Sequence, residues 1–104
     1  MDSRPGMREA VRRVQQQLVE AQAALVGETV QAEAGDGAVR VLMSGTQECR
    51  ALTIAPELLA PAQAARLQAL LVEAFNRALH ESRLLAARRL GPLTASAGGE
   101  GAEA

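Results

Sequence analysis

The sequence predicts an α+β fold of two layers, in which a helix, a three-stranded antiparallel sheet and a second helix follow one another. Three observations support this prediction. A heptad-like apolar pattern runs through residues 7–25, period-two alternation with two tight turns covers residues 29–54, and a broad apolar stripe covers residues 67–86. This order needs no parallel crossover and no internal repeat.

The first helix is expected over residues 5–26. Its apolar residues are spaced alternately four and three apart, which is the heptad seam of a helix that packs against one other helix. They are Met7, Val11, Val14, Leu18, Ala21 and Leu25. Gly27 is expected to end the helix, because glycine readily adopts the left-handed conformation found at helix C-termini.

Residues 29–54 predict a meander of three strands. Their apolar residues alternate with polar ones and are Val30, Ala32, Ala34, Val39, Val41, Met43, Leu52 and Ile54. The turns are expected at Gly35-Asp36-Gly37 and Gly45-Thr46-Gln47, where glycine tolerates positive φ. Pro56 ends the third strand, because proline cannot donate the next hydrogen bond of a ladder.

The second helix is expected to begin at Pro61, where the missing N–H would be unpaired in any case. Before it, Pro56–Leu59 predicts one helical turn that tucks two leucines against the sheet. The stripe comprises Leu67, Leu70, Leu71, Ala74, Phe75, Ala78, Leu79, Ser82, Leu85 and Ala86. Leu90-Gly91-Pro92 is expected to close the helix. The domain is expected to span residues 1–95, and the small, acidic residues 96–104 to be disordered.

Composition limits the size of the core and the class of protein. The chain has 104 residues, 48% of them apolar, and a single aromatic residue, Phe75. One copy would be marginally stable, so an oligomer is expected. Cys49 has no partner for an internal disulfide, which fits a reducing compartment. No stretch resembles a signal peptide or approaches membrane-spanning length. We therefore expect a cytoplasmic protein without membrane contact.

The basic residues are unevenly distributed, although the formal net charge is −1. There is no lysine. Residues 1–14 carry four arginines against two acids, and residues 77–90 carry four arginines against one acid, whereas residues 15–76 are acidic. Because the two helices run in opposite directions, the start of the first and the end of the second are expected to meet. The sequence thus predicts an arginine-rich tip remote from the sheet.

Arg4, Arg8 and Arg12 are four residues apart and share one helix face, with a rise of about 6 Å between neighbours. That interval is close to the spacing of phosphates along a nucleic-acid strand. The alternative is a solvated face stabilised by ion pairs between residues four apart. The sequence has no aromatic residues on which bases could stack, so any contact with nucleic acid should go to the phosphates of a duplex.

No catalytic or metal-binding pattern is present in the sequence. His80 is the only histidine, and Ser82, two residues on, would not face it on a helix. Gly35-Asp36-Gly37 lies between strands and is not a phosphate-binding loop. Cys49 is expected to be a small packing residue, with a reactive thiol as the alternative. We expect a protein that is not an enzyme and has no cofactor, metal or small-molecule substrate.

The central stretch and the second helix resemble the YbaB/EbfC family of bacterial nucleoid-associated proteins. The matching segments are Gly37–Val41, Met43–Gly45, Leu52–Leu59, Val72–Ala78 and Leu90–Thr94, and the likeness covers about residues 7–95. It implies a homodimer built around the sheets, with protruding helices, that binds DNA with little sequence preference and organises the chromosome or regulates genes. Arginines replace the lysines usual in the family, Ser44 stands where asparagine is usual, and Ala55 replaces an aspartate.

The leading hypothesis is a non-enzymatic, homodimeric protein of the nucleoid that binds double-stranded DNA. The arginines assigned to phosphate contacts are Arg4, Arg8, Arg12, Arg13, Arg83, Arg88 and Arg89. A protein-binding adaptor or chaperone-like clamp, which would grip its partner with the protruding helices, is the second reading. A purely structural oligomerisation domain is the third. Leu42, which points away from Val41 and Met43, is a candidate dimer contact.

Overall fold

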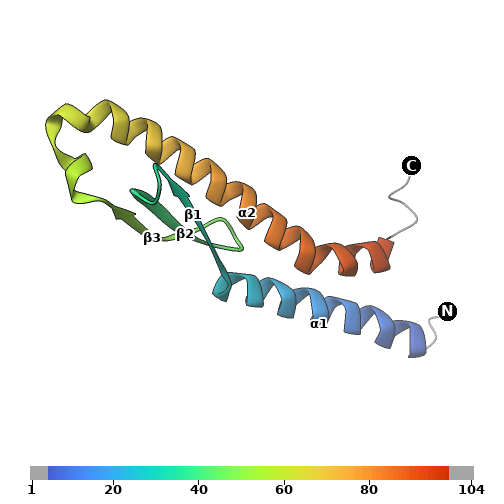
Figure 1. Ribbon diagram of the computed structural model, residues 1–104. Coiled ribbons are helices and arrows are strands. Elements are labelled where there is room, and N and C mark those ends of the chain that lie inside the picture. Colours follow the sequence, from blue (N-terminus) through green and yellow to red (C-terminus); the bar gives the residue numbers. More distant parts are fainter. Residues whose placement is uncertain (1–4, 99–104) are drawn as a thin grey trace.

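The computed structural model describes residues 5–98, and it has the predicted order of elements. They are α1 (Pro5–Gly27), β1 (Thr29–Ala34), β2 (Val39–Ser44), β3 (Cys49–Ile54), the short 3-10 helices η1 (Pro56–Leu59) and η2 (Pro61–Gln63), and α2 (Ala64–Gly98). The molecule is elongated, at 71 × 29 × 18 Å, because both long helices extend past the sheet (Figure 1). The predicted α+β arrangement is confirmed.

The core lies between α2 and one face of the sheet. The strands are antiparallel in the order β1-β2-β3, and Val39 and Val41 of the central strand are fully buried. Ala74 and Ala78 of α2 are also fully buried. Because alanines four residues apart lie on one helix face, they let α2 approach the valines closely. The predicted apolar faces of β1, β2 and α2 form this core.

The two turns of the meander use glycine for different reasons. In the first turn, Gly35, Asp36 and Gly37 all have positive φ, with values of 64°, 55° and 87°. In the second turn the positive φ, 63°, belongs to Gln47. Gly45 is needed for space, because a Cβ there would lie 2.6 Å from a methyl carbon of Leu25. Glycine at position 45 thus permits α1 to pack directly on the turn.

The turn between β2 and β3 holds the end of α1. The backbone N–H of Gly45 donates to the carbonyl oxygens of Leu25 and Glu28, both at 3.0 Å. Arg50 Nη2 donates to the carbonyl oxygen of Val26 at 2.8 Å. The last carbonyls of a helix have no partner within it, so these bonds satisfy groups that would otherwise need water. The side chain of Leu25 is buried beneath the same turn.

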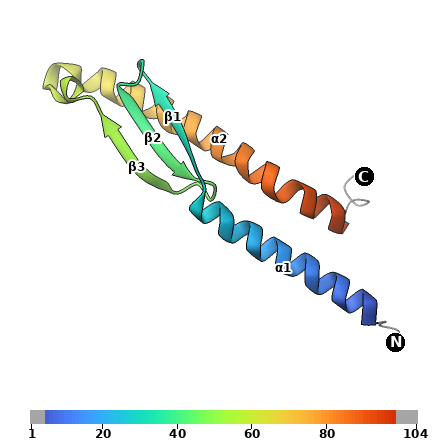
Figure 2. The same ribbon diagram turned by 60° about the horizontal axis from the view of Figure 1, so that its bottom comes forward.

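The same turn also holds α2. Ser82 is fully buried, and its Oγ donates to the carbonyl oxygen of Ser44 at 2.7 Å. Gln47 Nε2 donates to Ser82 Oγ at 3.0 Å. Since both helices are fixed at one turn, they lie side by side and extend beyond the same end of the sheet, with their chains running in opposite directions (Figures 1 and 2).

The predicted end of the second helix was wrong. The helix continues through Gly91 and Pro92 to Gly98. Proline removes one backbone hydrogen bond, but its fixed φ is compatible with a helix, and alanines and other small residues follow it. Of the segment expected to be disordered, residues 96–98 lie within α2. Residues 99–104 lie outside the described residues.

Three local predictions near β3 also need correction. Pro61 opens η2, and α2 itself begins at Ala64. In η1, Leu58 is buried, whereas Leu59 is 63% exposed. Cys49 is exposed and is not a packing residue. Leu59 and Cys49 are exposed because α2 crosses β1 and β2 and leaves β3 uncovered, so side chains on and beside β3 lack a covering layer.

Replacing Gly45 by alanine should destabilise the fold. The added methyl group would collide with Leu25, and relief of overpacking of this kind costs about 1–3 kcal/mol. Gly91→Ala is the control, because a Cβ at position 91 meets no atom within 4 Å. Since alanine favours helices, Gly91→Ala should be neutral or stabilise by up to about 1 kcal/mol. Urea denaturation followed by circular dichroism measures both. Equal stability of Gly45→Ala and the parent chain would contradict the close contact.

Candidate nucleic-acid interface

The N-terminal part of α1 projects beyond the rest of the molecule. Along the apolar seam, Leu25 is buried, Val11 is 53% exposed and Met7 is 63% exposed. The intervening seam residues, Val14, Leu18 and Ala21, are half-buried. This gradient arises because α2 covers the part of α1 nearest the sheet and ends before it reaches the first turns (Figure 2). The first turns of α1 are therefore a solvated rod.

Arginines occupy this projecting rod. Arg8 and Arg12 lie on one face, one helical turn apart, and Arg13 lies about 100° further round the helix. All three are exposed. Arg12 and Arg13 form no ion pair with any residue in the described range 5–98. Arg4, also predicted for this face, lies outside the described residues.

Arg89 of α2 is bound next to the C-terminal end of α1. Its Nε donates to Glu28 Oε1 at 3.0 Å, and its Nη2 donates to Glu28 Oε2, so the guanidinium and carboxylate form a bidentate pair. This hydrogen bond and the carboxylate charge raise the pKa of Arg89 above its ordinary value. Glu28 follows the last residue of α1, and no sequence pattern had singled it out. The pair joins positions 61 residues apart.

The predicted meeting of the two arginine clusters at one tip was wrong. Both helices do project from the same end of the sheet (Figure 1). However, most of α2 packs across the sheet. Along the axis of α1, Arg89 therefore lies no further out than Glu28, with which it pairs. At 1.5 Å per residue, Arg12 lies about 24 Å further out along α1. Arg83 and Arg88, both exposed, point in other directions from α2 than Arg89 does. The two clusters are separate.

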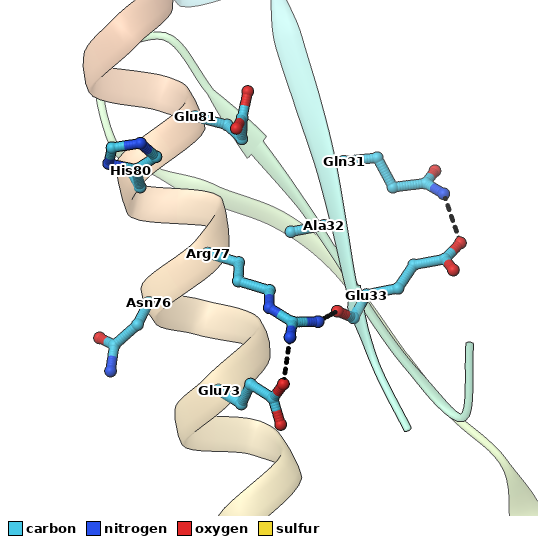
Figure 3. Close-up of a pocket in the computed structure, with 8 residues that line it drawn as sticks. All are labelled: Gln31, Ala32, Glu33, Glu73, Asn76, Arg77, His80 and Glu81. Carbon is cyan, nitrogen blue, oxygen red and sulfur yellow. Dashed lines mark hydrogen bonds and ion pairs between the residues drawn. The ribbon is translucent and has the colours of Figure 1, made fainter. Parts of the chain in front are cut away.

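A groove of about 710 Å³ lies elsewhere, between β1 and α2 (Figure 3). Arg77 crosses it. Its Nη1 donates to the carbonyl oxygen of Glu33 at 2.7 Å, and its Nη2 pairs with Glu73. Arg77 therefore satisfies a carbonyl on the free edge of the sheet, and its charge is already paired.

This groove is unsuited to phosphate or to a metal ion. Three carboxylates line it, from Glu33, Glu73 and Glu81, against the single guanidinium of Arg77. An anionic ligand would meet net repulsion there. His80 lies on the rim and is exposed. Within residues 5–98, no cluster of three histidine, cysteine or acidic side chains could hold a metal ion. The basic rod of α1 is thus the better candidate for binding nucleic acid.

The family comparison agrees with this geometry. The model of the YbaB/EbfC DNA-binding family matches residues 1–97 of the chain. The chain belongs to the YbaB/EbfC family. A nucleoid-associated protein of Mycolicibacterium vanbaalenii is 44% identical over 88 residues, which cover 85% of this chain and 80% of the relative. One from Corynebacterium urealyticum is 37% identical over 100 residues, covering 93% and 95% of the two chains.

Solved structures support the fold of this YbaB/EbfC chain. The crystal structure of an uncharacterized protein from Helicobacter pylori superposes with a TM-score of 0.70 and covers 94% of this chain and 99% of that one. The sequences are 19% identical, so the likeness concerns the fold alone. In the part of the chain that the structure describes, neither long helix is apolar enough over a sufficient length to cross a membrane.

Proposed function

We propose that this protein binds double-stranded DNA with little sequence preference, through phosphate contacts made by the first turns of α1, and so helps to organise the bacterial nucleoid. One observation carries the proposal: exposed arginines are concentrated on the part of α1 that α2 leaves uncovered. Membership of a DNA-binding family supports it.

The side chains suit phosphates better than bases. The guanidinium group can donate two parallel hydrogen bonds to a phosphate. Arg8 and Arg12 are one helical turn apart, about 6 Å along the axis, so each can meet a different phosphate. Contacts of this kind position a protein on a duplex without reading its sequence. The lack of aromatic residues near these arginines argues against stacking on unpaired bases.

The predicted arginines do not contribute equally in this proposal. Arg8, Arg12 and Arg13 of α1 form the principal phosphate-binding set, and Arg4, which precedes α1 in the sequence, is assigned to the same set. Arg83 and Arg88 of α2 are exposed and add a second, weaker set near the sheet. Arg89 acts mainly through Glu28, because a guanidinium already paired with a carboxylate must give up that pair to bind phosphate. No enzymatic activity is proposed.

Removing Arg8 and Arg12 should weaken DNA binding and make it less sensitive to salt. In a fluorescence-anisotropy titration of a labelled duplex at several salt concentrations, log affinity falls with log salt by about 0.9 for each phosphate neutralised. The double variant Arg8→Gln/Arg12→Gln should therefore lower the slope by about 2 for each chain bound.

The control for this titration makes the same change of charge elsewhere. Arg40 and Arg66 are exposed and lie on β2 and near the start of α2, away from the projecting part of α1. Arg40→Gln/Arg66→Gln should leave the slope nearly unchanged. If the two double variants lose equal affinity, net charge rather than the α1 face governs binding, and the assignment fails.

We also propose that the functional unit is a homodimer, formed on the apolar surface beside β3. Leu52 of β3 is 43% exposed on the face of the sheet that α2 covers elsewhere. Val72 of α2 is 62% exposed. Phe75 and Leu79 lie three and seven residues after it, on the same face of the helix. That side of α2 lies opposite the one bearing Arg77, which binds β1. Val72, Phe75 and Leu79 therefore face β3, and together with Leu52 they form an apolar strip.

A second copy suits this strip better than it suits the opposite face of the sheet. Leu42 lies on the opposite face and is half-buried, but its neighbours there include Gln31, Arg40 and Thr53. The strip beside β3 instead offers exposed apolar side chains together with an unpaired strand edge. Such an edge is usually covered or paired in stable proteins. A dimer would present two projecting α1 rods to a duplex.

Replacing Leu52 by aspartate should convert the dimer into monomers, because a charge on the strip would be buried without a partner. Leu84→Asp is the matched control, since Leu84 is similarly exposed, at 39%, on a different side of α2. Light scattering coupled to size exclusion measures the mass of each variant. A parent chain that is monomeric at micromolar concentration, or a Leu52→Asp variant that stays dimeric, would contradict this interface.

The alternative function, a protein-binding clamp, also has an observation in its favour. Met7 and Val11 are exposed beside the arginines of the projecting rod. An amphipathic partner helix could pack on these residues. The two functions differ in their response to substitution. Met7→Ser/Val11→Ser should abolish partner binding and leave the salt slope of DNA binding unchanged, whereas Arg8→Gln/Arg12→Gln should chiefly affect DNA.

A further inference from the structure

Helix α1 has a second continuous face, turned away from α2. It lies about 100° round the helix from the seam that contains Leu18 and Leu25. Its residues recur at intervals of four and three and are all exposed: Arg8, Arg12, Gln15, Val19, Gln22 and Val26. The acids of α1, Glu9 and Glu20, lie further round the helix, so neither interrupts this face. The face is therefore basic at its start and uncharged beyond Arg12.

The uncharged part of this face carries side chains that can read base pairs. The amide of a glutamine can donate to N7 of adenine and accept from its N6 amino group. An apolar side chain can contact the methyl group of thymine. Gln15 and Val19 offer these two groups one helical turn apart. Because Val19 is 64% exposed, its side chain contributes little to the folding of this chain.

The part of α1 that carries these residues fits the major groove of a duplex. Arg89 pairs with Glu28, and α2 ends nine residues later, at Gly98. At 1.5 Å per residue, α2 therefore ends about level with Val19, which precedes Glu28 by nine residues. Beyond that level no other described element lies beside α1 (Figure 2). A single helix is about 10–12 Å across, and the major groove is about 12 Å wide.

The spacing of the side chains also suits a duplex. Arg12 lies about 4.5 Å along the axis from Gln15, so the arginine can hold a phosphate at the edge of the groove while the amide reaches its floor. Gln15 and Val19 are about 6 Å apart, which corresponds to about two base-pair steps of roughly 3.4 Å. A partner helix could also pack on this face, but two arginines without an intervening acid favour a polyanion.

We propose that α1 enters the major groove, where Gln15 hydrogen-bonds to adenine and Val19 contacts the methyl group of thymine. Phosphate contacts supply most of the affinity, and these two residues add a weak preference for A·T base pairs. This inference rests on the proposed function, because the arginines that bind phosphate must first bring α1 to the duplex. Gln15 and Val19 are thus specificity-determining residues.

The preference is tested by fluorescence anisotropy with two labelled duplexes of equal length, one of alternating A·T and one of alternating G·C pairs. The parent chain should bind the A·T duplex about five- to tenfold more tightly, the lower end of the range for direct base contacts. Gln15→Ala should reduce this ratio severalfold. Gln17→Ala is the matched control and should keep it, because Gln17 is exposed on a different side of α1.

Modified bases test the individual contacts. In the A·T duplex, 7-deazaadenine removes the N7 acceptor, and uracil in place of thymine removes the methyl group. Each modification should weaken binding by the parent chain. Gln15→Ala should be insensitive to 7-deazaadenine and remain sensitive to uracil, whereas Val19→Ala should show the reverse. This pairing of one side chain with one atom would not arise from a general effect of DNA shape.

The outcomes separate this inference from the proposed function. Equal affinity of the parent chain for both duplexes would overturn base reading and leave phosphate binding standing. A preference that Gln15→Ala and Val19→Ala both retain would assign it to DNA shape and overturn the roles of these residues. A lower mass of DNA-free Val19→Ala in light scattering would place a second copy on this face and also overturn base reading. Absence of binding to any duplex would overturn the proposed function itself.

Discussion

The architecture depends on one turn, residues 44–47, that receives both long helices. The N–H of Gly45 donates to the carbonyl oxygens of Leu25 and Glu28, at the end of α1. The carbonyl oxygen of Ser44 accepts a hydrogen bond from the buried hydroxyl of Ser82 in α2. These hydrogen bonds are directional, whereas the hydrophobic effect is not. Together with the packing of Ala74 and Ala78 on the sheet, the turn therefore fixes how each helix leaves the sheet.

A fixed direction determines where the charges lie. Since α2 crosses the sheet before it reaches α1, its last arginines arrive only at the root of the projecting pair, where Glu28 binds Arg89. The arginines of the first turns of α1, Arg8, Arg12 and Arg13, stay exposed. A chain with a net charge of −1 can thus present a strongly basic surface, because its acids are concentrated around the sheet.

The fold could be predicted from local patterns, whereas the site depended on tertiary register. The period of two in the strands and the apolar stripe of α2 each report on a local conformation, and both were predicted correctly. Gly27 was correctly expected near the end of α1, but it is the last residue of the helix and does not have the positive φ expected of it. Pro92 misled the prediction, because a local rule about proline does not count the small residues that extend the helix beyond it. Gly45 was predicted as a turn residue, but its packing role required knowledge of Leu25.

The positions of the arginines could not be predicted from the sequence for a similar reason. Opposite helix directions correctly predicted that both helices project from one end of the sheet. How far each helix extends beyond the sheet depends on how many residues of α2 pack on the sheet. This number is set by the packing of Ala74, Ala78 and Ser82. The pair between Glu28 and Arg89 joins residues 61 apart, and no spacing rule reaches that far.

The attachment of both helices to one turn is most directly tested by pulsed electron paramagnetic resonance. Spin labels at Gln16→Cys and Ala87→Cys, in a Cys49→Ser chain diluted with unlabelled protein, report the distance between α1 and α2. An axial offset of about 21 Å and a helix spacing of about 10 Å predict a single narrow distribution near 20–30 Å. A broad distribution, or one centred well beyond that range, would contradict the account.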